Sequence, residues 1–83
     1  MRRYYFDMRE GDDILPDDEG LELGSLEAVR EEAARSLADM ARDAIRKHNG
    51  AESHREIAIE VRDEIGPILR VAFTFTINRH SRR

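Results

Sequence analysis

One long run decides the fold of this chain: residues 25–47, SLEAVREEAARSLADMARDAIRK. Its apolar residues recur at intervals of three and four, the period of a helix with one buried face. That stripe consists of Leu26, Val29, Ala33, Leu37, Met40 and Ala44. Ser25 is placed to cap the first turn, and Glu27 and Lys47 suit the two ends of the helix dipole. The run therefore predicts a helix of about six turns with one face against a core.

A second set of small and apolar residues widens this stripe: Ala34, Ala38, Ala41 and Ile45. They extend the apolar sector to nearly half of the helix circumference, more than a helix on one sheet normally needs. We expect the segment from Ile14 to Leu23 to fold over this flank. The alternative is a second subunit, since small alanines let another backbone approach closely. The four residues are therefore candidate interaction residues.

The sequence on both sides of the helix alternates between apolar and polar residues, as half-buried strands do. Before the helix, residues 3–9 alternate, and residues 14–15 can return beside them as a short strand that Pro16 ends. After the helix, residues 57–62 and 69–77 alternate, and Gly66-Pro67 joins them as a hairpin. We predict a two-layer α+β domain of order β-β-α-β-β, with the helix packed on a three- or four-stranded antiparallel sheet.

Length and composition limit the class of protein. The chain has 83 residues, enough for one domain, which we expect at residues 1–78 with a basic tail at 79–83. It has no cysteine, which excludes disulfides and cysteine-bound zinc. No apolar run suits a signal peptide or a membrane span, so we expect a cytoplasmic protein that does not bind membranes. A second copy would add burial to so short a chain, so homodimerisation is also expected.

The most conspicuous charged feature is an acidic segment between Glu10 and Glu22, which carries seven acidic residues and no basic one. Clustered carboxylates can bind a cation or dock a basic partner. Their order does not match a helix-loop-helix calcium site. The simplest interpretation is a solvated turn that keeps a sheet edge soluble. Docking of a basic partner by Asp17, Asp18 and Glu19 is the functional alternative, and cation binding stays open.

Residues that would suggest catalysis are scattered. His48, His54 and His80 do not stand at ligand spacing on one element. The serines lack a neighbouring base, and no Gly-x-Ser-x-Gly motif is present. We therefore predict no catalytic residue, no metal site and no cofactor, and a protein that is not an enzyme.

Nucleic-acid binding has two partial supports in the sequence. Tyr5 lies on an aromatic strand and could stack on a base. The chain also carries arginines near both termini: Arg2, Arg3, Arg79, Arg82 and Arg83. The acidic pI of about 5.3 works against phosphate binding. Nucleic-acid binding through Tyr5 and these arginines is therefore an alternative function.

Several motifs together carry a resemblance to a known family. They are Arg3-Tyr4-Tyr5-Phe6-Asp7, Asp17-Asp18-Glu19-Gly20-Leu21-Glu22-Leu23, Leu26-Glu27-Ala28, Ala41-Arg42-Asp43 and Val61-Arg62-Asp63-Glu64. Their order and spacing resemble a family of short bacterial proteins carrying a domain of unknown function, typified by a Tyr-x-Phe-Asp start and an Asp-Glu-x-Gly loop before an Ala-rich helix. The resemblance covers nearly the whole chain and implies no activity, substrate or cofactor.

The first half of the chain is also similar to HicB-type antitoxins, in which a strand, an acidic loop, a strand and an Ala-rich helix follow in similar order. That resemblance implies a module that binds a partner protein. From the residues and the resemblances together, we expect a small non-catalytic protein-interaction or regulatory module with an unidentified protein partner or a second copy of itself.

Overall fold

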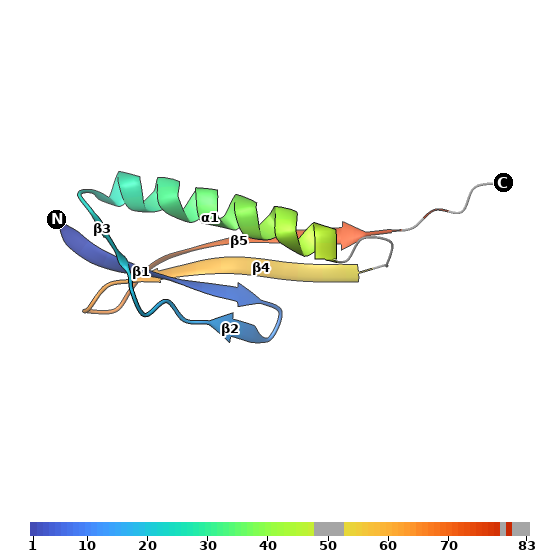
Figure 1. Cartoon of the computed structure of the whole chain (residues 1–83), viewed down its shortest axis with the longest axis horizontal. Coiled ribbons are helices and arrows are strands. Elements are labelled where there is room, and N and C mark those ends of the chain that lie inside the picture. The colour runs from blue at the N-terminus through green and yellow to red at the C-terminus, as the bar shows by residue number, and fades with distance from the viewer. Residues whose placement is uncertain (48–52, 79, 81–83) are drawn as a thin grey trace.

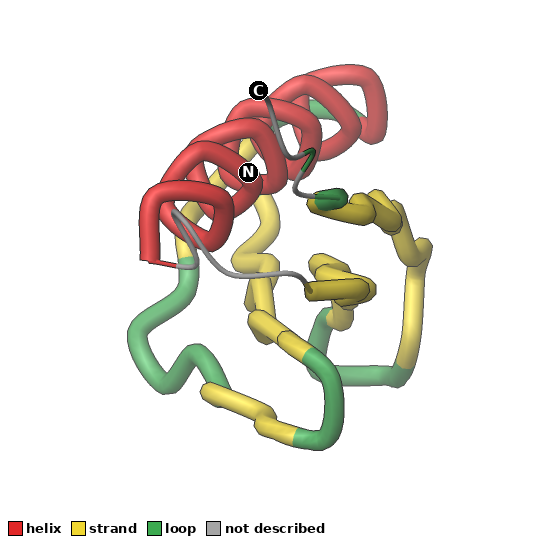
Figure 2. Tube along the Cα trace, turned by 90° about the vertical axis from the view of Figure 1, so that its right-hand side faces the viewer, coloured by secondary structure: helices red, strands yellow, loops and turns green. Residues whose placement is uncertain are grey.

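The computed structural model describes residues 1–47, 53–78 and 80. Its elements follow in the order β1 (Arg2–Glu10), β2 (Asp13–Leu15), β3 (Leu21–Leu23), α1 (Leu26–Lys47), β4 (Ser53–Arg62) and β5 (Pro67–Ile77). Figure 1 shows α1 lying along one face of the sheet, and the view along the molecule in Figure 2 separates the two layers. The predicted two-layer α+β fold is confirmed.

The sheet has five antiparallel strands, one more than the largest number expected. Four of them form the path β2-β1-β4-β5, and β3 also pairs with β1. The long strand β1 accommodates both short strands on one edge, because β2 pairs with residues 8–10 and β3 with residues 2–4. The extra strand is Leu21–Leu23, which we expected to approach the core but did not expect to pair with another strand.

The centre of the core lies on β4, the strand with long neighbours on both sides. Ile57, Ile59 and Val61 are fully buried, and they lie opposite Phe73, Val71 and Leu69 of β5 in that order. From the helix, Val29 and Ala33 are also fully buried. The alternation that predicted these strands therefore identifies the face that meets the helix.

The start of α1 is fixed as the sequence predicts. The backbone N–H of Ala28 donates to Ser25 Oγ at 3.1 Å, and the N–H of Val29 donates to the Ser25 carbonyl at 3.1 Å. A side-chain oxygen at this position satisfies an N–H that has no partner within the helix. At the other end of the helix, Asn49-Gly50 predicts a stop from the sequence, and these two residues fall outside the described ones.

The expectation that Ile14 to Leu23 covers the alanine flank of α1 was wrong. Leu15 and Leu21 face the other side of the helix, in a hollow that Glu32 and Ser36 also line. The reason is the strand order: β2 and β3 pair with β1, whereas the alanine flank lies on the β5 side. The flank is therefore left uncovered by the segment expected to shield it.

On the face of the sheet that points away from the helix, ion pairs connect side chains of β1, β4 and β5. Glu60 Oε2 accepts from Arg9 Nε and from Arg70 Nε, both at 3.2 Å, and Arg70 Nη2 also donates to Glu56 Oε1 at 3.0 Å. Between these groups Ala58 is fully buried. Side chains of β1, β4 and β5 thus cover one another on this face.

The β4–β5 hairpin turns around one buried carboxylate, Asp63. Its Oδ1 accepts from the N–H groups of Ile65 and Gly66 at 2.8 and 3.0 Å, and Arg2 Nη1 donates to Oδ2 at 3.2 Å. The N–H of Gly66 and then that of Ile65 hold the pKa of Asp63 below its ordinary value. The turn is therefore held by an ionised aspartate.

Gly20, which directly precedes β3, has a backbone that requires glycine. Its φ is +75°, and a Cβ there would lie 2.9 Å from Tyr5 Cε2 and 3.0 Å from the Tyr4 carbonyl oxygen. Left-handed backbone is unfavourable for residues that carry a Cβ. The acidic loop thus passes over β1 at a distance that only glycine permits.

We predict that Gly20→Ala lowers the free energy of unfolding by about 2 kcal/mol, the combined cost of left-handed backbone and the close contact. Gly24→Ala is the matched control, because a Cβ on Gly24 meets no atom within 4 Å. Urea denaturation of both variants measures the difference. Equal stabilities for the two variants would contradict this view of the loop.

Candidate functional site

The acidic loop is anchored to β1 by the carboxylate of Asp17. Asp17 Oδ2 accepts from the backbone N–H of Phe6 at 3.0 Å, in the middle of β1. Asp17 Oδ1 accepts from the N–H groups of Glu19 and Gly20 at 3.0 and 3.1 Å. One side chain therefore folds its own loop and attaches it to a strand.

A second carboxylate and an arginine complete this anchor. Asp7 Oδ1 accepts from the backbone N–H of Asp17 at 2.9 Å, and Arg62 Nε donates to Asp7 Oδ2 at 2.9 Å. Arg62 Nη2 also donates to the Asp17 carbonyl at 2.9 Å, and its guanidinium lies 4.6 Å from the centre of the Tyr5 ring. We call Tyr5, Asp7, Asp17, Gly20 and Arg62 the loop clamp.

The electrostatics of the loop clamp keep both carboxylates ionised. Burial raises the pKa of Asp7, but the hydrogen bonds from Arg62 and from the Asp17 N–H outweigh it, so the pKa lies below its ordinary value. Burial also raises the pKa of Asp17, and the N–H groups of Phe6, Gly20 and Glu19 outweigh it in the same way. The hydrogen bond to Asp7 in turn raises the pKa of Arg62. The three pKa shifts thus arise from hydrogen bonds that the residues of the loop clamp make with one another and with the loop backbone.

The three acidic residues proposed for docking separate into two kinds. Asp17 is engaged within the loop clamp, whereas Asp18 and Glu19 are exposed. Arg3 reduces the local negative charge, because it donates to the Glu19 carbonyl at 2.7 Å and pairs with Glu22 at 3.2 Å. Docking of a basic partner through Asp18 and Glu19 stays a prediction.

The residues proposed for nucleic-acid binding are partly engaged elsewhere. The Tyr5 ring has a guanidinium over it, and Arg2 and Arg3 pair with Asp63 and Glu22. The other arginines of the proposal, Arg79, Arg82 and Arg83, lie outside the described residues. Base stacking on Tyr5 would therefore have to displace Arg62.

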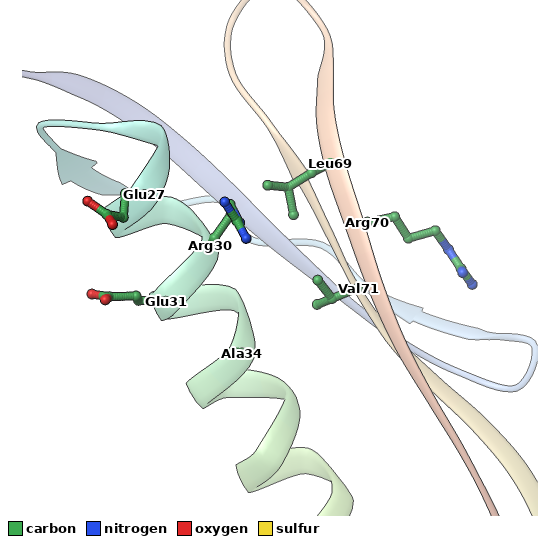
Figure 3. Close-up of a pocket in the computed structure, with 7 residues that line it drawn as sticks. All are labelled: Glu27, Arg30, Glu31, Ala34, Leu69, Arg70 and Val71. Atoms are coloured by element: carbon green, nitrogen blue, oxygen red, sulfur yellow. The ribbon is translucent and has the colours of Figure 1, made fainter.

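Two of the helix residues proposed for interaction, Ala34 and Ala41, lie beside β5, and Ala38 and Ile45 share their face of the helix. Ala34, Ala38 and Ile45 are exposed, whereas Ala41 is half-buried and packs against the cluster around Phe75. Between Ala34 and β5 lies a groove of about 660 Å³. Figure 3 shows Leu69 and Val71 pointing from β5 toward the helix, while Arg70 points the other way. The structure thus joins the alanine flank to a strand that sequence reasoning did not connect with it.

That strand, β5, lies at one end of the sheet and pairs only with β4 in the described sheet path. Phe73, near its middle, is 41% exposed although it faces the helix layer. We call the free edge of β5 together with Ala34, Ala38, Ala41 and Ile45 the edge groove. The missed signal was residues 71–77, VAFTFTI, which contain no charge and no proline.

The hydrogen-bonding groups at this free edge follow from the pairing. The Phe6 N–H points to Asp17 and thus away from β4. In antiparallel pairs the direction of these groups alternates, so Val61, opposite Phe6, directs its groups toward β5. Val61 pairs with Leu69, so Leu69 and every second residue after it direct their backbone groups toward β4. The N–H and C=O groups of the alternate residues, Arg70, Ala72, Thr74 and Thr76, therefore point to the free edge.

Within residues 1–47, 53–78 and 80, no three side chains of metal-ligating type gather into one group. The helix in this part of the chain is not apolar enough to cross a bilayer.

Comparison with known proteins places the chain in a family. Residues 3–74 match the family described as a domain of unknown function, DUF6894, and the chain belongs to it. The match confirms the resemblance inferred from the motifs, and it lends no support to the likeness to HicB-type antitoxins. No curated protein and no solved structure matches the chain.

We predict that Asp17→Ala lowers the free energy of unfolding by about 1 to 3 kcal/mol, because it leaves the N–H groups of Phe6, Glu19 and Gly20 without their acceptor. Asp18→Ala removes a neighbouring exposed carboxylate and should change stability by less than about 0.5 kcal/mol. Urea denaturation compares the two. An equal loss of stability in both variants would show that the removed charge, and not the loss of the hydrogen bonds to Asp17, lowers the free energy of unfolding.

Acid should weaken the loop clamp. The pKa values of Asp7 and Asp17 are lowered in the folded chain, so the unfolded chain binds protons first as the pH falls. Their contribution to stability is complete above the ordinary value of 3.8 and is lost as the pH drops below it through the folded values. We expect Asp17→Asn to lose less stability than the unmodified chain between about pH 5 and pH 3. Parallel loss in both proteins would be the contrary result.

Proposed function

We propose that this chain is a small protein-interaction module that acts by binding another polypeptide and not by catalysis, with the edge groove as its binding surface. One observation carries the proposal: β5 is a long strand whose free edge is uncharged over residues 71–77, and it lies beside an exposed alanine flank. Such an edge can accept a further strand, with the flank providing apolar contact.

The contrast between the two edges of the sheet supports the proposal. On the β1 side the edge is covered by β2 and β3, three residues each, and by the loop clamp between them. Short strands and acidic residues are common protection against unwanted pairing. The β5 edge has neither over residues 71–77, and its proline, Pro67, lies at the very start of the strand. An unprotected edge is expected where pairing is the function.

Exposed apolar side chains lie along the same surface. Phe73 is 41% exposed and Ile45 is 42% exposed, and both lie on the side of α1 and β5 that the described residues leave uncovered. Ala34 and Ala38 between them present little bulk, so a partner backbone can approach the helix closely. The groove beside Ala34 combines apolar residues, Leu69 and Val71, with the charged helix residues Glu27, Arg30 and Glu31, a mixture that suits an amphipathic polypeptide segment.

We predict that Ala34→Glu reduces binding of partner polypeptides at least about tenfold, because it replaces a small apolar side chain with a long charged one opposite Leu69 and Val71. Arg35→Glu is the matched control, since it places the same side chain at the next position of the helix, away from the groove. Affinity capture from the native cell, with bound polypeptides quantified by mass spectrometry, compares the two variants with the unmodified chain. Capture of the same polypeptides in the same amounts by Ala34→Glu would remove the edge groove from the proposal.

A further inference from the structure

We infer that the edge groove binds a second copy of this chain, by antiparallel pairing of β5 with β5 about a two-fold axis at Phe73. The inference rests on the proposed function, because it uses the same surface, and it names the partner and the register. A symmetric dimer requires a surface that is complementary to itself. Three features of β5 and α1 meet that requirement.

The first feature is the symmetry of the strand around Phe73. The apolar residues of β5 that face the helix layer are Leu69, Val71, Phe73, Phe75 and Ile77. In the proposed register Leu69 lies opposite Ile77, Val71 opposite Phe75, and Phe73 opposite its own copy. Every apolar side chain on this face therefore meets another one, and the two helices lie on the same side of the joined sheet.

The second feature is that the free hydrogen-bonding groups match in this register. The edge groups of Ala72 face those of Thr74 in the other copy, and Arg70 faces Thr76. Arg70 is the charged residue of β5 and already pairs with Glu56 and Glu60. The two Arg70 side chains are six residues apart along the strand, about 20 Å, so the two Arg70 charges do not oppose each other.

The third feature is the position of the helix over the sheet. The core clusters place α1 above both β4 and β5, and neighbouring strands are about 4.8 Å apart. A helix above the midline of β4 and β5 would lie about 5 Å from the two-fold axis, which places the two helix axes about 10 Å apart. That is the upper end of the 8 to 10 Å typical of packed helices. The small residues Ala34, Ala38 and Ala41 fit helices that meet at this distance.

The contact is smaller than a standard interface. The nine residues 69–77 of β5 and the four flank residues of α1 make thirteen residues a side, against roughly 20 or more in a standard interface, so backbone pairing of the two β5 edges has to contribute to the affinity. The chain is short, and burial of Phe73 and Ile45 would add apolar burial that a domain of this length otherwise lacks. A second copy thus supplies both a strand and a helix flank to cover the edge.

Sedimentation equilibrium over a micromolar concentration range tests the association. We expect the unmodified chain to dimerise and Phe73→Arg to weaken the dimer at least about tenfold, because it places two charges together on the axis. Leu15→Arg is the matched control on the opposite edge, where Leu15 is 61% exposed, and it should remain dimeric. A monomer at all concentrations, or a dimer unaffected by Phe73→Arg, overturns the inference.

Cysteine cross-linking tests the register without relying on a charged variant. The chain has no cysteine, so each introduced thiol reports alone. Phe73→Cys should oxidise to a covalent dimer, since directly opposed residues lie within disulfide distance. Val71→Cys should not cross-link with itself, being offset by about 13 Å, but should cross-link with Phe75→Cys when the two are mixed. Efficient self-linking of Val71→Cys, or none for Phe73→Cys, overturns the register.

The two proposals fail in different ways. A monomeric chain whose captured polypeptides are lost on Ala34→Glu overturns the dimer and leaves the proposed function in place. A dimer broken by Phe73→Arg, with Ala34→Glu losing this chain itself but capturing every other polypeptide in unchanged amounts, leaves the dimer in place and overturns the wider binding role.

Discussion

In the middle of β1, the carboxylate of Asp17 provides the hydrogen-bond acceptor that a neighbouring strand would otherwise provide. The strands β2 and β3 pair with the two ends of β1, and neither reaches Phe6 between them. An unpaired backbone N–H inside a structure costs free energy, and Asp17 Oδ2 provides its acceptor. The same carboxylate also orders its own loop. Asp17 therefore supplies the missing backbone partner on the β1 edge and places β3 next to β1 before the helix begins.

This constraint gives the sheet two different edges. The acidic loop, β2 and β3 cover the β1 side, and Arg62 of β4 donates to Asp7 of β1 and to the Asp17 carbonyl of the loop. The helix lies over β4 and β5, so its alanine flank extends to the other edge. The acidic loop and β1, which carry several of the sequence motifs, are held by contacts within the chain, whereas the β5 side is the surface that we propose for a partner. Family-specific residues are not in themselves evidence for an active site.

Sequence reasoning succeeded where the signal is local. The helix, its cap at Ser25 and the strand faces follow from periods of 3.6 and 2 residues and from one turn of capping geometry. It failed for contacts between distant residues: Arg62 and Asp7 are 55 positions apart, and Phe6 and Asp17 are 11 apart. The motifs contained Asp7, Asp17, Gly20 and Arg62, but their shared role required the strand order. The candidate residues Ala34, Ala38, Ala41 and Ile45 were identified as a flank, and only the fold shows that β5 lies beside them.

Amide hydrogen exchange, measured residue by residue by NMR at increasing protein concentration, tests most directly whether one edge is closed within the chain and the other by a second copy. The Phe6 amide should be protected at every concentration, because its acceptor belongs to the same chain. The amides of Ala72 and Thr74, at the free edge of β5, should exchange rapidly in dilute solution and become protected together as the concentration rises. Rapid exchange of Phe6, or exchange of Ala72 and Thr74 that does not depend on concentration, would contradict this account.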